Sequence, residues 1–191
     1  MNIYDQYPDS VEVDGRVYYI DLSYDRVLRV IDAQDDAALT DADRIDYQAR
    51  LLIADGSRVP RGVEEQARFL RAVFELFPKP EHTSTERYID FHQDAAMIRS
   101  GFFRIGIDLT KQKIHFFQFM ELLADLPADT ALMRTIEIRS KPIPKATKYN
   151  ADEIAAIQKA KARVAIKMSD EERRERFARS LKQATIFSTG G

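Results

Sequence analysis

The sequence predicts a mainly α-helical protein, in which an N-terminal β-hairpin packs on a multi-helix domain and a helical arm forms the C-terminal part. Three observations predict this class. The pair Asp14-Gly15 separates two short runs of β-branched and aromatic residues, apolar residues then recur at helical spacing, and a basic, proline-containing segment precedes the last two helical patterns. With 191 residues, of which 45% are hydrophobic, the chain can bury a substantial core.

The hairpin is the clearest local signal. The runs Val11–Val13 and Arg16–Ile20 flank an Asp-Gly pair, which tolerates the positive φ angles of a type I′ turn. Two strands alone are marginally stable in water. The hairpin must therefore dock on helices or pair with another chain, and in the second case its free edge would be an assembly surface.

Two helices are expected directly after the hairpin. Ser23 can cap a helix that reaches about Ile31, and Thr40 with Asp43 resembles a capping box for a second helix to about Ala54.

A third, amphipathic helix is expected to begin at Pro60, because proline is well placed in a first turn, where its missing N–H costs nothing. Apolar residues at spacings of three and four define the face that we expect to contact the core. These residues are Val63, Ala67, Leu70, Phe74 and Phe77.

The middle of the chain predicts two further helices. One begins near Asp94 and closes before Gly106, a residue suited to the left-handed position after a helix. The next, over residues 111–125 with Thr110 as its cap, is the most hydrophobic segment, and its narrow polar stripe places it at the centre of the core. Its aromatic residues Phe116, Phe117 and Phe119 are interpreted as a core cluster.

Beyond Pro127, a short helix capped by Asp129 or Thr130 is expected to reach about Ile138. Residues 139–145 contain two prolines and are interpreted as a stiff basic connector that cannot be helical. We therefore divide the chain into a domain of residues 1–140, with the hairpin and helical core, and residues 141–191, with the connector and the helical arm.

Capping patterns predict two helices in the arm. Asn150 with Glu153 marks the start of a helix over residues 151–167, and Ser169 with Glu172 marks one over residues 170–185. Their apolar stripes are thin, which favours an arm that packs loosely or waits for a partner. Four residues of these stripes are the candidate partner-binding or self-association residues: Ile157, Val164, Phe177 and Leu181.

Charge is unevenly distributed along the chain. Residues 1–60 contain 13 acids and 6 bases, whereas residues 134–191 contain 7 acids and 14 bases. Such asymmetry indicates a basic tail for an acidic partner, or head-to-tail self-association. Two solvated faces of opposite sign are an equally good interpretation.

Composition excludes several functions. The chain has no cysteine, its three histidines are not at metal spacing, and its seven glycines form no phosphate-binding pattern. We interpret the carboxylates Asp90, Asp94 and Asp108 as residues that cap helices and turns. We therefore expect no enzyme, no cofactor and no metal. No apolar run is long enough to span a membrane, and a pI near 6.0 with dispersed basic residues argues against a nucleic-acid binder.

Several segments in one order resemble a known family. They are the Val-Glu-Val-Asp-Gly hairpin, the run from Asp90 to Ile98, the run from Gly106 to Thr110, the aromatic run from Ile114 to Phe119, and the segment from Leu126 through Lys145. This order is similar to the tail-gene family of long-tailed phages and prophages of Gram-positive bacteria. Its genes lie between those of the major tail protein and the tape measure protein, and its members are regarded as tail assembly chaperones.

The resemblance implies a function through binding. The chain would bind and solubilise the tape measure protein, a long helical protein with an apolar surface, and recruit the major tail (tube) protein in the cytoplasm of the bacterial host. It would act as a homo-oligomer, without a cofactor, and be absent from the mature virion. The alternative that we retain is a small helical nucleic-acid-binding or regulatory protein of a prophage.

Overall fold

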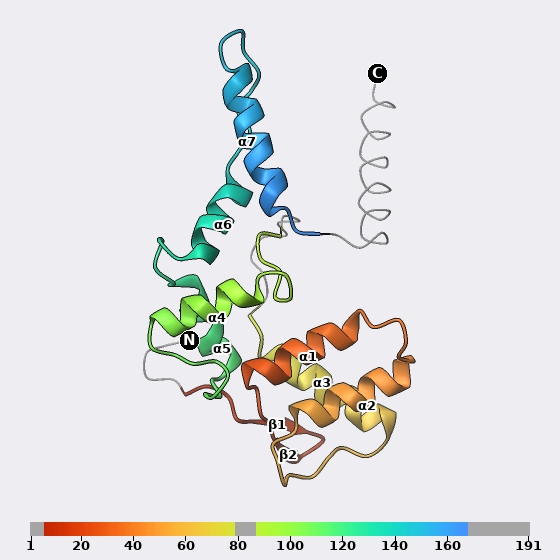
Figure 1. The fold of residues 1–191 in the computed structure, drawn as a ribbon. Coiled ribbons are helices and arrows are strands. Elements are labelled where there is room, and N and C mark those ends of the chain that lie inside the picture. Colours follow the sequence, from red (N-terminus) through yellow and green to blue (C-terminus); the bar gives the residue numbers. More distant parts are fainter. Residues whose placement is uncertain (1–5, 79–86, 168–191) are drawn as a thin grey trace, which may run out of the picture. The chain divides into compact units, whose positions relative to one another are not determined.

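The computed structural model describes residues 6–78 and 87–167. Over these residues the chain has seven helices and one two-stranded antiparallel hairpin, so the predicted mainly α-helical class is confirmed (Figure 1). The elements in chain order are β1 (Ser10–Val13), β2 (Arg16–Tyr19), α1 (Tyr24–Gln34), α2 (Asp41–Leu52), α3 (Gly62–Glu75), α4 (Ala95–Arg104), α5 (Phe116–Ala124), α6 (Ala131–Ser140) and α7 (Ala151–Val164).

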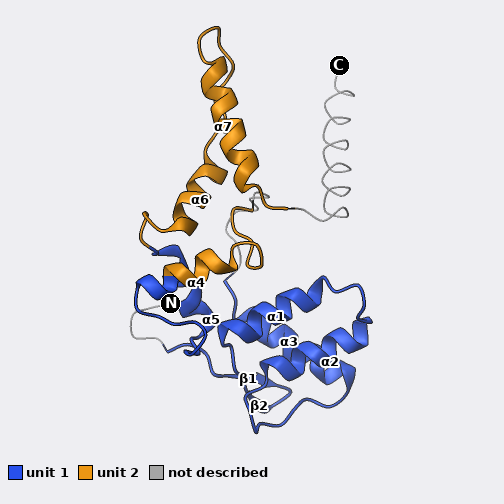
Figure 2. Cartoon of the chain, in the orientation of Figure 1, with its two compact units in different colours: residues 1–84, 102–126 blue, residues 85–101, 127–191 orange. Residues whose placement is uncertain are grey.

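The chain forms two compact units that interleave along the sequence, and Figure 2 shows them in different colours. Unit 1 consists of residues 1–84 and 102–126, and unit 2 consists of residues 85–101 and 127–191. The division into residues 1–140 and 141–191 expected from the sequence stays a prediction.

The hairpin forms as predicted, and it docks on a helix of unit 1. Asp14 and Gly15 have φ angles of 52° and 73°, as a type I′ turn requires. The ring of Tyr18 lies edge-on to that of Phe69 in α3, with a centroid distance of 5.7 Å. The Tyr18 hydroxyl also donates a 2.5 Å hydrogen bond to Glu65 of the same helix. Burial against α3 therefore supplies the support that two strands alone lack.

Helix α2 begins as its capping signal predicts. Oγ1 of Thr40 accepts a hydrogen bond from the N–H of Asp43 at 3.2 Å. Helices α1 and α2 are joined by the buried side chain of Gln48, whose Nε2 donates to the carbonyl oxygen of Val30 at 3.0 Å. Helix α3 begins at Gly62, two residues later than expected, and Pro60 lies before its cap residue Arg61.

Helix α5 also begins later than the predicted start at Lys111. The backbone before it pairs with the segment that follows the hairpin: the N–H of Phe116 donates to the carbonyl of Leu22 at 2.7 Å, and the N–H of Tyr24 donates to the carbonyl of Ile114 at 3.0 Å. These bonds hold residues 114–116 against the other segment, so the helix cannot extend back to Lys111. The cap is consequently His115 and not Thr110.

Unit 2 is organised by a buried ion pair. Asp94 is fully buried and Arg139 is 7% exposed. The guanidinium of Arg139 donates to both carboxylate oxygens of Asp94, at 2.5 and 2.9 Å. It also donates to the carbonyls of Tyr88 and Val164, at 2.8 and 2.6 Å. One side chain thus joins the start of α4, the end of α6, the end of α7 and the segment before α4.

The non-helical connector begins two residues later than the sequence predicted. Arg139 and Ser140 form the last turn of α6, and the non-helical connection begins at Lys141. Thr130 caps α6 as expected, with Oγ1 accepting from the N–H of Met133 at 3.3 Å. Asn150 makes no capping hydrogen bond to α7. The helix predicted over residues 170–185 lies outside the described residues.

The buried pair predicts a large effect of Arg139→Ala. Removing the guanidinium leaves the buried carboxylate of Asp94 without its countercharge, which costs about 3–5 kcal/mol of unfolding free energy. Urea unfolding followed by circular dichroism measures this loss. Arg134→Ala, which removes an exposed arginine from the same helix, is the matched control and should change stability by less than about 0.5 kcal/mol. Equal effects of the two substitutions would contradict the assignment.

Candidate functional site

Helix α3 carries apolar side chains outside its buried face as well as on it. Its buried residues are Gln66, Phe69, Leu70 and Val73, whereas Val63 and Phe74 are each 45% exposed. At 100° per residue, the buried face is rotated by roughly 70° from the face that the sequence predicted. The expectation that Val63 and Phe74 contact the core was therefore wrong, and the two side chains lie beside the core, within reach of solvent.

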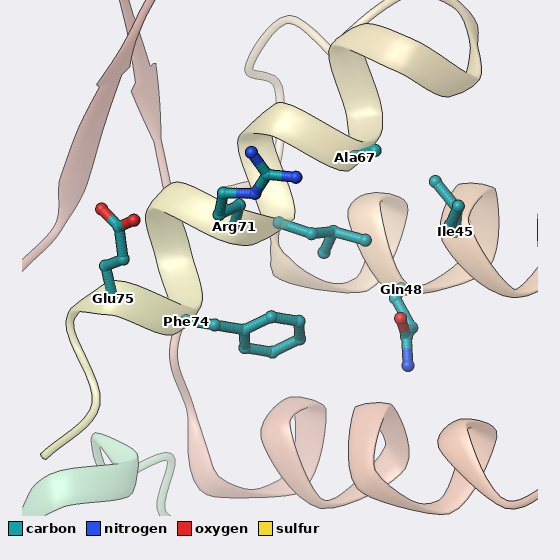
Figure 3. Close-up of a pocket in the computed structure, with 7 residues that line it drawn as sticks. Ile45, Gln48, Ala67, Arg71, Phe74 and Glu75 are labelled. Carbon is teal, nitrogen blue, oxygen red and sulfur yellow. The ribbon is translucent and has the colours of Figure 1, made fainter. Parts of the chain in front are cut away.

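The exposed side of α3 forms one wall of an open groove. Between α2 and α3 lies a hollow of about 450 Å³, and Figure 3 shows the ring of Phe74 extending from α3 toward Gln48 of α2. The residues that line it are Ile45 and Gln48 of α2 and Ala67, Leu70, Arg71, Phe74 and Glu75 of α3. We call this hollow the α2–α3 groove.

The groove is suited to bind apolar side chains. Its deep polar residue, Gln48, is already hydrogen-bonded to α1, so it offers little to a ligand. Arg71 and Glu75 are exposed and form no ion pair with another described residue. An open apolar hollow between two helices, with one charge of each sign beside it, matches the way in which grooves receive one face of an amphipathic helix.

A row of aromatic rings supports the wall of the groove. Phe74 is edge-on to Phe77 at 6.3 Å, and Phe77 is edge-on to Phe117 of α5 at 5.2 Å. Phe116 and Phe119 of the predicted aromatic cluster are buried, and Phe117 is half-buried. Edge-to-face pairs of this kind add about 0.5–1.5 kcal/mol each beyond burial. They connect the end of α3 to α5 and so position Phe74.

The row continues to a histidine. His115 stacks on Tyr7 with a centroid distance of 4.6 Å, and its Nδ1 accepts a hydrogen bond from the N–H of Phe117 at 3.2 Å. Burial lowers the pKa of His115, and the backbone of Pro8 together with the carboxylates of Asp21 and Glu121 opposes that shift only in part. The imidazole is therefore neutral in the folded chain near neutral pH, as a cap that accepts a hydrogen bond requires.

Two of the four residues that the sequence proposed for partner binding, Ile157 and Val164, are described, and neither lines the groove. Ile157 is 8% exposed, so its side chain is buried within the chain. Val164 is half-buried, and its carbonyl accepts the hydrogen bond from Arg139. Phe177 and Leu181 lie outside the described residues. The partner-binding role of these four residues stays a prediction, and the groove is a feature that the sequence analysis missed.

The carboxylates considered for chemistry have structural partners. Asp90 accepts hydrogen bonds from the N–H groups of His92 and Gln93, and Asp108 accepts from the N–H and hydroxyl of Thr110. Over residues 6–78 and 87–167, no group of three histidine, aspartate or glutamate side chains could hold a metal ion. No described helix has the length and apolar composition to cross a bilayer.

Comparison with known proteins places the chain in a family. Residues 3–166 match the model of the family described as Bacteriophage Gp15 protein. This match spans most of the chain, which therefore belongs to that family of bacteriophage proteins. No curated protein and no solved structure matches the chain.

Two substitutions in α3 test which face enters the core. Phe69→Ala empties a fully buried site and should cost about 3–5 kcal/mol of unfolding free energy. Phe74→Ser, on the groove side, should cost only about 1–3 kcal/mol, because roughly half of its surface is already exposed and one aromatic pair, with Phe77, is lost. Chemical denaturation of both variants measures the two losses of unfolding free energy. A loss for Phe74→Ser as large as that for Phe69→Ala would show that the groove side belongs to the core.

The lowered pKa of His115 predicts that the stability of the chain depends on pH. Because its pKa is lowered in the folded chain, the unfolded chain binds the proton more readily. The stabilisation is complete above the unfolded pKa of about 6.5 and is lost as the pH falls toward the folded pKa. Denaturation between pH 7.5 and 5.5 should show a smaller decline for His115→Asn, which can cap but cannot titrate, than for the unsubstituted chain. Parallel declines would refute this role.

Proposed function

We propose that this member of the phage family is a tail assembly chaperone. It binds the tape measure protein in the host cytoplasm, keeps that protein soluble, and promotes polymerisation of the major tail protein around it. The chain acts by binding and release, without catalysis and without a cofactor, and it leaves before the virion is complete. The resemblance in gene family and the groove on unit 1 both support this proposal.

The observation that carries the proposal is the open α2–α3 groove. A long helical client with an apolar surface offers side chains at i, i+3, i+4 and i+7 along one face. The groove presents Ile45, Leu70 and Phe74 on two neighbouring helices, so it can take a short part of such a stripe. Arg71 and Glu75 lie beside the hollow, where their charges can set the direction and the partners of the incoming helix.

The size of the groove fits reversible binding. Covering the exposed half of Phe74 contributes about 1 kcal/mol, because full burial of such a side chain is worth about 1.5–3 kcal/mol. A few contacts of this size give weak affinity for each copy. A long client can still be covered, because neighbouring sites on one molecule raise the effective concentration of the chaperone. Weak individual contacts then allow the growing tube to displace the copies one at a time.

A second candidate function is favoured by the charge of unit 2. Residues 127–167 contain nine bases and four acids, a composition that attracts nucleic acid. Two of these cations are already engaged, since Arg139 is in the buried pair and Lys161 donates to a backbone carbonyl. Affinity for duplex DNA that falls steeply with salt would support this alternative.

Co-expression tests the proposed function. The tape measure protein encoded with this chain should be soluble when both are produced together, and Phe74→Ser should lower the soluble fraction several-fold because an anchor of the groove is lost. Val17→Ser is the matched control, since it removes an apolar residue of 59% exposure from the hairpin. The proposal is wrong if the tape measure protein is equally soluble, or equally insoluble, with and without the chaperone.

A further inference from the structure

Strand β1 directs part of its backbone away from the hairpin. The N–H of Ile20, the residue after β2, donates to the carbonyl of Asp9 at 2.8 Å. Hydrogen-bonded and non-hydrogen-bonded pairs alternate along an antiparallel ladder. Asp9 and every second residue after it therefore direct their backbone groups toward β2, whereas Ser10 and Glu12 direct theirs away from it. We call the outward side of β1, with the backbone groups of Ser10 and Glu12, the β1 edge.

The backbone groups of the β1 edge are free. Over residues 6–78 and 87–167, no group forms a hydrogen bond with the backbone N–H or carbonyl of Ser10 or Glu12. The outward side of β2 differs, because there the N–H of Ala54 donates to the carbonyl of Tyr19 at 3.0 Å. The β1 edge thus offers two donors and two acceptors, and such a row of groups is a template for pairing with another strand.

The core of unit 1 holds the edge in an extended conformation. Val11 and Val13 of β1 are 8% and 7% exposed, so one face of the strand is buried. Natural edge strands are commonly protected by a lysine, a proline or a bulge. The sequence Ser-Val-Glu-Val of β1 contains neither residue, and its register with β2 is continuous. An incoming strand would therefore meet a backbone that is already ordered, which lowers the entropic cost of binding.

The charge beside the edge is negative. Residues 6–15 contain three acids and no base. Asp14 is paired with Arg68 at 2.9 Å, whereas Glu12 is exposed and forms no ion pair with another described residue. A base directly opposite Glu12 on an incoming strand would stabilise the pairing. The β1 strand of a second copy brings no base and adds a second Glu12 to the same face, so charge disfavours a pair of copies at this edge.

We propose that the β1 edge binds an extended, basic segment of another protein. The segment adds to the hairpin as a third, antiparallel strand, and its backbone pairs with that of Ser10 and Glu12. A lysine or arginine lies opposite Glu12, and the next residue lies opposite Val11. Addition of a strand to an exposed edge is a common mode of peptide recognition, in which the backbone supplies affinity and alternate side chains supply specificity.

This site is separate from the α2–α3 groove. Strand addition requires an extended segment with unpaired backbone groups, whereas the groove receives the side chains of a helix, whose backbone groups are bonded within the helix. The proposal therefore does not rest on the proposed function. Either one can fail while the other stands.

Peptide titration of the full chain tests the contact. The probe is a fluorescein-labelled peptide, Thr-Lys-Val-Lys-Val-Lys-Thr, and binding is followed by fluorescence anisotropy. The dissociation constant should lie below about 1 mM, and the same peptide with glutamate at the lysine positions should bind at least tenfold more weakly. Absence of binding, or equal binding of the two peptides, overturns the proposal.

Backbone methylation of the lysine peptide distinguishes strand pairing from attraction between charges. Methyl groups on the backbone nitrogens of the lysines remove the donors that would face β1, so binding should fall at least tenfold. Methyl groups on the backbone nitrogens of the valines, which would face away from β1, are the matched control, because both peptides keep the same charge. Equal binding of the two methylated peptides overturns the strand addition.

Substitutions of Glu12 locate the site on the chain. Glu12→Pro removes an N–H that bonds to no described residue and leaves the ladder to β2 intact, so the variant should fold and bind the lysine peptide at least tenfold more weakly. Glu12→Lys should reverse the preference between the lysine and glutamate peptides. Glu64→Lys, at an exposed position of α3, is the matched control and should keep the original preference.

Two results with these variants would overturn the site. One is unchanged peptide binding by Glu12→Pro when circular dichroism shows that it is folded, or by Glu12→Lys. The other is a sedimentation mass of the unsubstituted chain that falls on Glu12→Pro substitution without any peptide, because a second copy would then occupy the edge. If Glu12→Pro does not fold, Glu12→Lys and the methylated peptides decide the question.

Discussion

The apolar groove of unit 1 follows from a mismatch between the apolar side chains of one helix and the face of that helix that enters the core. An α-helix turns by 100° per residue, so only one arc of its surface can enter a core. In α3, Phe69 and Val73 occupy that arc, while Val63 and Phe74 lie outside it. Exposing these two apolar side chains to water is unfavourable. It leaves an apolar groove where a regular amphipathic helix would present polar side chains.

Different interactions hold the two units together. In unit 1 the aromatic row from Phe74 through Phe77 to Phe117 joins α3 to α5. In unit 2 the buried pair of Asp94 and Arg139 joins the start of α4 to α6, and Arg139 also donates to a carbonyl at the end of α7. The α2–α3 groove is small. A small preorganised contact suits the proposed chaperone, which would bind many times along a client and then leave it.

Local signals predicted most of the fold, and long-range contacts explain what they missed. The Asp14-Gly15 turn and the Thr40 cap depend on residues that are neighbours in sequence, so the local sequence pattern was sufficient to predict them. The start of α5 depends on backbone bonds between Phe116 and Leu22, which no local pattern contains. Apolar periodicity gave the amphipathic nature of α3 but not the arc that enters the core. The ion pair joins residues 45 positions apart, and the groove joins two helices.

The central claim is that the α2–α3 groove holds the client. Site-specific photo-cross-linking tests it directly: a benzophenone amino acid replaces Phe74, or Val17 on the hairpin as the control, in cells that also produce the tape measure protein. The account predicts a covalent adduct with the tape measure protein from position 74 and none from position 17. Equal adducts from both positions, or none from position 74 beside a soluble tape measure protein, would contradict it.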